Sequence, residues 1–348
     1  MKDKLFSKIH FFTLSALLFM ASCDLSTDDP FFFTNTFEKG VFVVNEGSFN
    51  GSGTITFYDP ESGEVIQDLF AAVNNGAALG QFVQSITFYN NLGYIVVNGA
   101  NKVVVVDGSS FEQIGVIEGF EQPRFFLPVS ANFAYVSQWG ADGLTGSVVK
   151  VNIGTLQIVK TIPVGKGPEK MWPKGTDVYV ANSGGFGLDS TVSIINTLDD
   201  TEKERRFAGG YNPASVAAFN NTSGVSLTYA LCRGDWNATT PQGLLGDLNN
   251  GGAGFNTVPG GDDLCTAPEG NKMYFIGGGA VWSVNQFAVS KLFDQNAYGL
   301  ACDPASGNLY TADAKDFSSN GEVVIYGANG GKISSFQAGV SPNEVVFR

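Results

Sequence analysis

One pattern of apolar and polar positions recurs seven times along the chain. Each copy starts with an aromatic residue, continues with two or three strand-forming residues and ends in a polar or small residue. The copies lie at residues 42–45, 94–98, 135–138, 179–182, 229–232, 274–277 and 310–313. Their last residues are 53, 40, 44, 50, 45 and 36 positions apart. A period of about 40 to 50 residues with several strands per unit is typical of a β-propeller.

Three further strands are expected in each unit. The repeated phrase is followed by a second strand that ends in Asp or Asn, as at 54–59, 147–152 and 191–196, and then by a third, as at 158–162. The remaining strand begins near a proline, as at 123–126, 168–172 and 213–219. Four strands per unit predict an all-β fold with seven blades. Residues 233–262 are the least regular unit, so a propeller with one blade more or fewer stays open as an alternative. A pair of unrelated all-β domains is the other alternative.

The two ends of the repeated region complement each other. The first phrase has no inner strand before it, whereas residues 341–347 read as an inner strand with no blade after it. We therefore expect the C-terminal strand to complete the first blade and close the ring, which removes an exposed sheet edge. The predicted propeller spans residues 41–348, after a tether at 23–40 that includes Phe31, Phe32 and Phe33.

Residues 1–22 read as an export signal. Lys2, Lys4 and Lys8 precede an apolar stretch at 11–20 that is too short to span a bilayer. Small residues before Cys23 resemble a bacterial lipobox, which predicts lipidation of Cys23; an ordinary secretory signal is the alternative. The acidic residues 24–30 resemble the export tag of Bacteroidetes surface lipoproteins. We expect the protein to be anchored in the outer membrane by this lipid alone. The propeller would then face either the cell surface or the periplasm.

Composition narrows the possible functions. The chain has 44 glycines, 13% aromatic and 15% charged residues, and a net charge of -13, which argues against a nucleic-acid partner. Its single histidine, His10, lies in the export signal. The mature chain therefore lacks the histidine of Ser-His-Asp and Cys-His catalysis and of most transition-metal sites. We expect no enzyme activity, no cofactor and no metal.

Two acidic doublets and one loop are possible exceptions. Asp199-Asp200 and Asp262-Asp263 are read as solvated turn residues, because neighbours on a strand point to opposite faces and so seldom share a site. Residues 247–251 only faintly match a calcium-binding loop, since the alternating ligands and the terminal Glu are missing.

Large aromatic residues mark one face of the expected ring. Loops that follow the repeated phrase and loops that enter the inner strands open on the same face of a propeller, and together they carry Phe49, Phe120, Trp139, Phe186, Tyr211, Trp236 and Phe317. Polar side chains are expected beside them at the start of the inner strands and in one loop: Gln84, Arg124, Lys170, Ser215, Arg233, Tyr298 and Glu344. An aromatic mouth with a polar lining predicts a ligand-binding site. The alternative is that the aromatic rings fold down and plug the channel.

The chain resembles the YVTN/YncE-like, surface-layer-type propellers. The resemblance rests on residues 161–168, 179–182 and 190–196, while residues 45–49 and 54–60 look like the opening of Bacteroidetes lipoproteins of this class. It covers nearly all of residues 41–348. Such lipoproteins include propellers that capture cobalamin at the cell surface and pass it to a TonB-dependent transporter of the outer membrane.

Three functions follow as hypotheses. The first is a lipoprotein that binds a small-molecule ligand, a corrinoid such as cobalamin, and presents it to that transporter. The second is a non-catalytic protein-interaction propeller in the cell envelope or surface layer. The third is a lyase or hydrolase that uses carboxylates.

Overall fold

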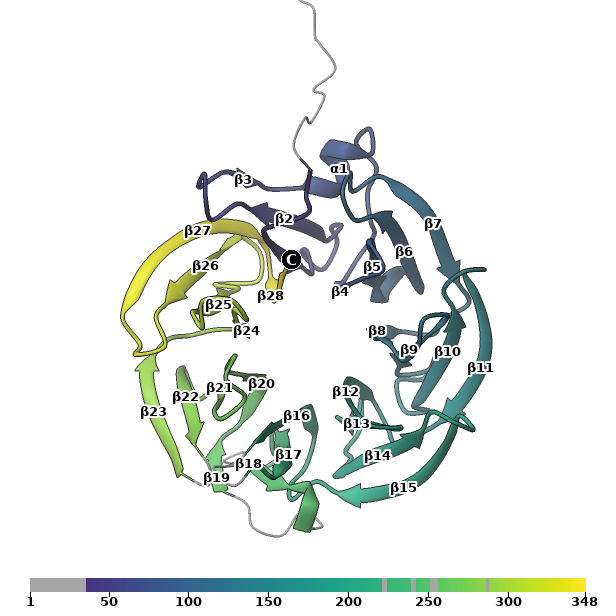
Figure 1. Cartoon of the computed structure of the whole chain (residues 1–348), viewed down its shortest axis with the longest axis vertical. Coiled ribbons are helices and arrows are strands. Elements are labelled where there is room, and N and C mark those ends of the chain that lie inside the picture. Colours follow the sequence, from purple (N-terminus) through teal and green to yellow (C-terminus); the bar gives the residue numbers. More distant parts are fainter. Residues whose placement is uncertain (1–35, 221–223, 239–241, 251–255, 286–287) are drawn as a thin grey trace, which may run out of the picture. The chain divides into compact units, whose positions relative to one another are not determined.

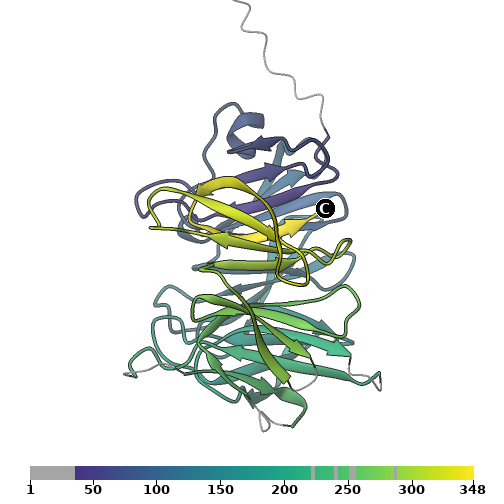
Figure 2. The ribbon, with the colours of Figure 1, turned by 90° about the vertical axis from the view of Figure 1, so that its left-hand side faces the viewer.

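The computed structural model describes residues 36–220, 224–238, 242–250, 256–285 and 288–348, and these form seven four-stranded antiparallel sheets arranged as a ring (Figure 1). The protein is a seven-bladed β-propeller, so the fold predicted from the repeated pattern is confirmed. Seen from the side, the strands cross the thickness of the ring and their loops gather at its two faces (Figure 2). Side chains that leave the strand ends are therefore presented on one face or the other.

In the first four blades, the innermost strand faces the channel and the other three follow it outward. Blade 1 contains β28 (Pro342–Phe347), β1 (Val41–Asn45), β2 (Thr54–Tyr58) and β3 (Val65–Ile66). Blade 2 contains β4 (Val83–Tyr89), β5 (Leu92–Val97), β6 (Lys102–Asp107) and β7 (Gln113–Glu118). Blade 3 contains β8 (Pro123–Pro128), β9 (Phe133–Gln138), β10 (Ser147–Asn152) and β11 (Gln157–Pro163). Blade 4 contains β12 (Pro168–Lys174), β13 (Asp177–Asn182), β14 (Thr191–Asn196) and β15 (Thr201–Phe207).

The remaining blades follow the same order. Blade 5 contains β16 (Pro213–Asn220), β17 (Ser226–Cys232), β18 (Gln242–Asp247) and β19 (Asn256–Pro259). Blade 6 contains β20 (Gly261–Thr266), β21 (Met273–Gly277), β22 (Ala280–Asn285) and β23 (Ala288–Asp294). Blade 7 contains β24 (Gly299–Cys302), β25 (Leu309–Asp313), β26 (Asn320–Tyr326) and β27 (Lys332–Val340). The short helices of the described residues are α1 (Leu69–Val73), η1 (Asn98–Ala100) and η2 (Leu248–Asn250).

The ring closes through the C-terminal strand, as the sequence predicted. β28 pairs with β1 in antiparallel register, with Val43 opposite Val345. Val43 and Val345 also belong to a hydrophobic cluster with Tyr310 and Phe336 of blade 7. The last strand thus joins the first blade by hydrogen bonds and the last blade by packing.

The repeated phrase forms the second strand of each blade and fills the space between blades. Tyr94, Tyr135, Tyr229 and Tyr274 are all fully buried. The ring of Tyr94 stacks on Phe126 of the next blade, with 4.2 Å between the ring centroids. Burial of such aromatic surface contributes favourably to the packing of neighbouring blades. The aromatic residue that defines the repeat in sequence is therefore a core residue.

The propeller begins earlier than residue 41. Phe37, which the sequence pattern assigned to the tether, is 0% exposed. Its ring packs edge-on against Phe57 and Phe111, at centroid distances of 5.1 and 6.4 Å, and its backbone N–H donates to the carbonyl of Ser109 at 2.8 Å. The segment before β1 thus fastens blade 1 to blade 2.

The predicted export signal at 1–22, the lipidation site Cys23 and the run at 31–33 lie outside the described residues. Within the described residues, no helix is long and apolar enough to cross a membrane.

We predict that Phe37→Ala destabilises the propeller by about 3–5 kcal/mol, as is usual for a buried phenylalanine. Phe49→Ala is the matched control, because Phe49 is 78% exposed, and its effect should stay within roughly 0.5 kcal/mol. Chemical denaturation of the two variants measures both values. Equal stability of the two variants would show that the segment before β1 is not part of the fold.

Candidate functional site

The inner strands of blades 1 to 6 share an irregularity where they enter the channel. In each, the strand pairing shifts register near its first residues, as between Pro168 and Met171 of β12, where the inner strand advances three residues while β13 advances two. Such a β-bulge bends the strand and changes the direction of its side chains. The second residues of these six strands consequently line one recess: Gln84, Arg124, Glu169, Ala214, Asp262 and Asn343.

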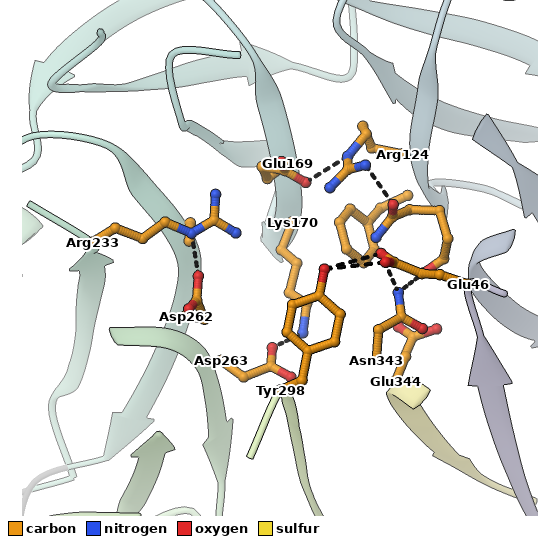
Figure 3. Close-up of a pocket in the computed structure, with 13 residues that line it drawn as sticks. Glu46, Arg124, Glu169, Lys170, Arg233, Asp262, Asp263, Tyr298, Asn343 and Glu344 are labelled. Carbon is orange, nitrogen blue, oxygen red and sulfur yellow. Dashed lines mark hydrogen bonds and ion pairs between the residues drawn. The ribbon is translucent and has the colours of Figure 1, made fainter. Parts of the chain in front are cut away.

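This central recess lies at the mouth of the channel (Figure 3). Besides those six residues, it is lined by Glu46 after β1, Phe125, Lys170, Arg233 after β17, Asp263, Tyr298 before β24, and Glu344. The recess has a volume of about 60 Å³. A volume of that size holds a few water molecules and is far below the ~300–1,000 Å³ of ordinary ligand pockets.

Each of the three basic side chains in the recess pairs with one carboxylate. Arg124 Nε lies 3.0 Å from Glu169 Oε2. Lys170 Nζ pairs with Asp263, and Arg233 Nε pairs with Asp262. Because five carboxyl groups line the recess, two of them, Glu46 and Glu344, have no basic partner within the described residues.

Glu46 is held by neutral donors. The hydroxyl of Tyr298 donates to Glu46 Oε2 at 3.1 Å, and Asn343 Nδ2 donates to Oε1 at 3.3 Å. Burial raises the pKa of Glu46, and this effect outweighs the opposing influence of Arg124 and of the Tyr298 hydrogen bond. Burial likewise raises the pKa of Tyr298, with Glu46 adding to the shift.

Glu344 is the more strongly perturbed carboxyl. Its Oε2 accepts the backbone N–H of Ile86 at 2.9 Å. Burial raises the pKa of Glu344 to about 7, although Lys170 and the Ile86 hydrogen bond act against this shift. For Lys170, burial alone would lower the pKa, but the carboxylates of Asp263 and Glu344 outweigh it and raise the pKa. Lys170 therefore stays charged between two carboxyl groups.

A chain of contacts connects the recess to the aromatic side chains above it. Arg124 also donates to Gln84, and its guanidinium lies 4.6 Å from the centroid of the Trp139 ring. Trp139 in turn meets Phe186 edge-on at 5.5 Å. On the other side of the mouth, the rings of Tyr298 and Phe317 meet edge-on at 5.2 Å.

Five aromatic side chains in the loops of this face are exposed. They are between 46% and 78% exposed and are called the rim aromatics below: Phe49, Phe186, Tyr211, Trp236 and Phe317. Phe49 and Trp236 follow the recess residues Glu46 and Arg233 by three positions in the same loops. Exposure of this much aromatic surface around a polar recess is typical of a binding surface.

The structure brings most of the predicted site residues together. Arg124, Lys170, Arg233, Tyr298, Gln84 and Glu344 line the recess. Ser215 lies deeper, in the wall of a cavity further along the channel. Trp139 is half-buried and contacts Arg124 of the recess on one side and Phe186 on the other. It therefore links the recess to the rim aromatics and is not itself one of them.

Two predictions about this site are wrong. Phe120 is 4% exposed and lies in the hydrophobic core between blades 2 and 3 with Ile117 and Phe126, so no ligand can reach it. Asp262 and Asp263 are not turn residues, because both lie in β20, line the recess and pair with Arg233 and Lys170, although the Asp262 side chain is still 45% exposed. The bulge at the start of β20 turns both neighbours toward the channel, which the alternation of a regular strand would forbid.

Glu46, Glu169 and Asn343 were not predicted as site residues. Glu169 and Asn343 each follow the proline that begins an inner strand, as Arg124 does. The position directly after that proline would have identified Glu169 and Asn343 from the sequence. Among the described residues, no group of three or more His, Cys, Asp or Glu side chains could hold a metal ion.

The raised pKa of Glu344 predicts a specific pH dependence. Between pH 4.5, which is the ordinary pKa of a glutamate, and about pH 7, the folded protein keeps a proton that the unfolded chain has lost. The free energy of unfolding contributed by this group therefore falls as the pH rises through that window. Glu344→Gln removes this contribution. The difference in melting temperature, variant minus wild type, should therefore increase as the pH rises from about 4.5 to 7. Parallel melting curves across this range would contradict the assignment.

Solved structures with the same architecture share little sequence with this chain. Hydrazine synthase of Kuenenia stuttgartiensis aligns with a TM-score of 0.61 and 17% identity over 77% of this chain and 92% of that chain. A quinoprotein alcohol dehydrogenase-like protein of Bacteroides thetaiotaomicron aligns with a TM-score of 0.66 and 16% identity over 90% and 79%. A functionally unknown protein of Desulfotomaculum acetoxidans aligns at 0.63 and 11% over 89% and 98%. At these identities the likeness shows the fold alone.

Sequence comparison gives a family. None of the curated proteins matches the chain. The family model described as "Domain of unknown function (DUF5074)" matches residues 39–219, a little over half of the 348 residues and all of blades 2 to 4. The chain therefore belongs to the DUF5074 family.

Proposed function

We propose that the protein is a ligand-capturing propeller that binds a broad, disc-shaped molecule, a corrinoid such as cobalamin, across the mouth of its channel. One observation carries the proposal: exposed aromatic side chains surround a charged recess on one face of the ring. The rim aromatics come from loops of different blades, so a ligand that contacts them together must be wide.

The size of the recess decides where such a ligand lies. At about 60 Å³ the recess cannot enclose it. A second cavity of about 350 Å³ adjoins the recess between the loops of blades 5 and 6, and shares Arg233 and Asp262 with it. Its wall contains Trp236 and three glycines, Gly234, Gly260 and Gly278, which leave backbone groups accessible. A ligand edge in this cavity would place the body of the ligand over the recess.

The chemistry of the mouth suits a neutral ligand that carries many amides. Arg233 offers hydrogen-bond donors and Asp262 offers acceptors side by side. An amide group donates and accepts, so it meets both without a net charge that the recess would repel. The corrin ring carries several amide side chains, and its broad faces offer apolar surface to aromatic side chains.

Anchoring and delivery complete the proposal. A lipid at Cys23 would hold the propeller at the outer membrane, and a TonB-dependent transporter would receive the ligand; both rest on the resemblance of the sequence to Bacteroidetes lipoproteins. No catalytic step is proposed, because the chain beyond His10 has no histidine to act as a general base.

A protein partner is the second candidate. Ile114 on β7 and Val159 on β11 are 56% and 55% exposed on the outer strands of neighbouring blades. Exposed apolar residues at the perimeter favour a contact with another protein, away from the mouth.

Calorimetric titration with cyanocobalamin tests the first candidate. We expect saturable binding, and Trp236→Ala and Phe317→Ala should each weaken it roughly tenfold through lost stacking. Leu198→Ala is the control, since Leu198 is 78% exposed in the β14–β15 turn on the opposite face. No binding of cyanocobalamin, or equal loss in the control, would overturn the proposal. Loss of a captured envelope protein on Ile114→Ser and Val159→Ser substitution would favour the second candidate instead.

A further inference from the structure

The channel contains a third cavity, which the proposed function does not use. It has a volume of about 230 Å³ and is called the channel chamber below. It shares Phe125, Lys170 and Glu344 with the central recess and otherwise lies further along the same inner strands. Its other lining residues are Thr87, Phe126, Leu127, Met171, Trp172, Ser215, Val216 and Leu264.

The walls of the chamber combine polar and apolar surface, and seven of its eleven lining residues are apolar. Phe125, Leu127, Met171 and Trp172 are only partly buried, although they lie at the centre of the ring. Protein interiors are normally packed with few voids larger than one water molecule. A hollow of this size, lined by aromatic and aliphatic side chains, gives an apolar molecule contacts that water cannot provide.

The polar end of the chamber carries an excess of negative charge. Lys170 is its only basic residue and already pairs with Asp263. Glu344 has its hydrogen bond to Ile86 but no basic partner of its own within the described residues. Asp263, Lys170 and Glu344 therefore sum to one negative charge when all three are ionised. The recess above adds Glu46, which is also without a basic partner there.

We propose that the channel chamber binds a small organic cation, a protonated amine on an aromatic or aliphatic body, with Glu344 as its counter-ion. A carboxylate ligand would add a second uncompensated negative charge, and a neutral ligand would leave Glu344 without a counter-charge. Trp172 also favours a cation over an anion, because aromatic rings attract positive charge, whereas the Phe125 ring already has Lys170 Nζ 5.6 Å from its centroid. This site is independent of corrinoid capture at the mouth.

Three probes of one shape test the charge of the ligand. 2-Phenylethylamine, 2-phenylethanol and 3-phenylpropionate share a phenyl ring and differ in the head group, and their binding to the full-length protein is measured by calorimetry at a mildly alkaline pH. We expect the amine to bind most tightly and the carboxylate most weakly. Equal affinities, tighter binding of the carboxylate, or no binding of the amine would overturn the proposal.

A pair of variants tests the position. Glu344→Gln keeps the shape of the side chain and should weaken amine binding about tenfold or more, because the negative charge that pairs with the ammonium group is lost. Glu112→Gln makes the same change at an exposed position before β7 and should leave binding unchanged. Loss of amine binding in Glu46→Gln but not in Glu344→Gln would place the cation in the recess and overturn the chamber assignment. Cyanocobalamin titration of the same variants separates this result from the proposed function, since corrinoid binding at the mouth does not require an occupied chamber.

Discussion

The structure depends on the packing of one repeated strand against the next blade. The aromatic residue of all seven phrases is buried, and in blade 2 it is Tyr94, which stacks on Phe126 of blade 3. The ring closes only if the last blade is also joined to the first, which β28 achieves, while Phe37 fastens blade 1 to blade 2. This closure brings all inner strands to one axis, with their first residues facing each other.

The charged recess is a consequence of that convergence. A regular strand would send neighbouring residues to opposite faces, but the bulges at the start of six inner strands turn two successive side chains toward the channel. Glu169 with Lys170, and Asn343 with Glu344, reach the recess in this way. The result is three ion pairs and two carboxyls that lack a basic partner, a charge imbalance that a packed core would not tolerate and that a ligand can correct.

The sequence was informative where the pattern is periodic. The aromatic phrases predicted the blades, and the unmatched strands at the two ends predicted the closure by β28. The recess was predicted in part, through Gln84, Arg124, Lys170, Arg233, Tyr298 and Glu344. The roles of Asp262 and Asp263 were misjudged because strand alternation does not reveal a β-bulge. The role of Phe120 was misjudged because loop length does not reveal how deeply a loop residue is buried. Phe37 was missed because a single aromatic residue before the first strand has no periodic partner.

Hydrogen–deuterium exchange with and without cyanocobalamin tests most directly whether the mouth is the binding face. Our account predicts slower exchange in the loops that carry Phe49, Phe186 and Phe317, and no change in the β14–β15 turn around Leu198 on the opposite face. Protection confined to outer strands such as β7 and β11, or no protection at all, would contradict it.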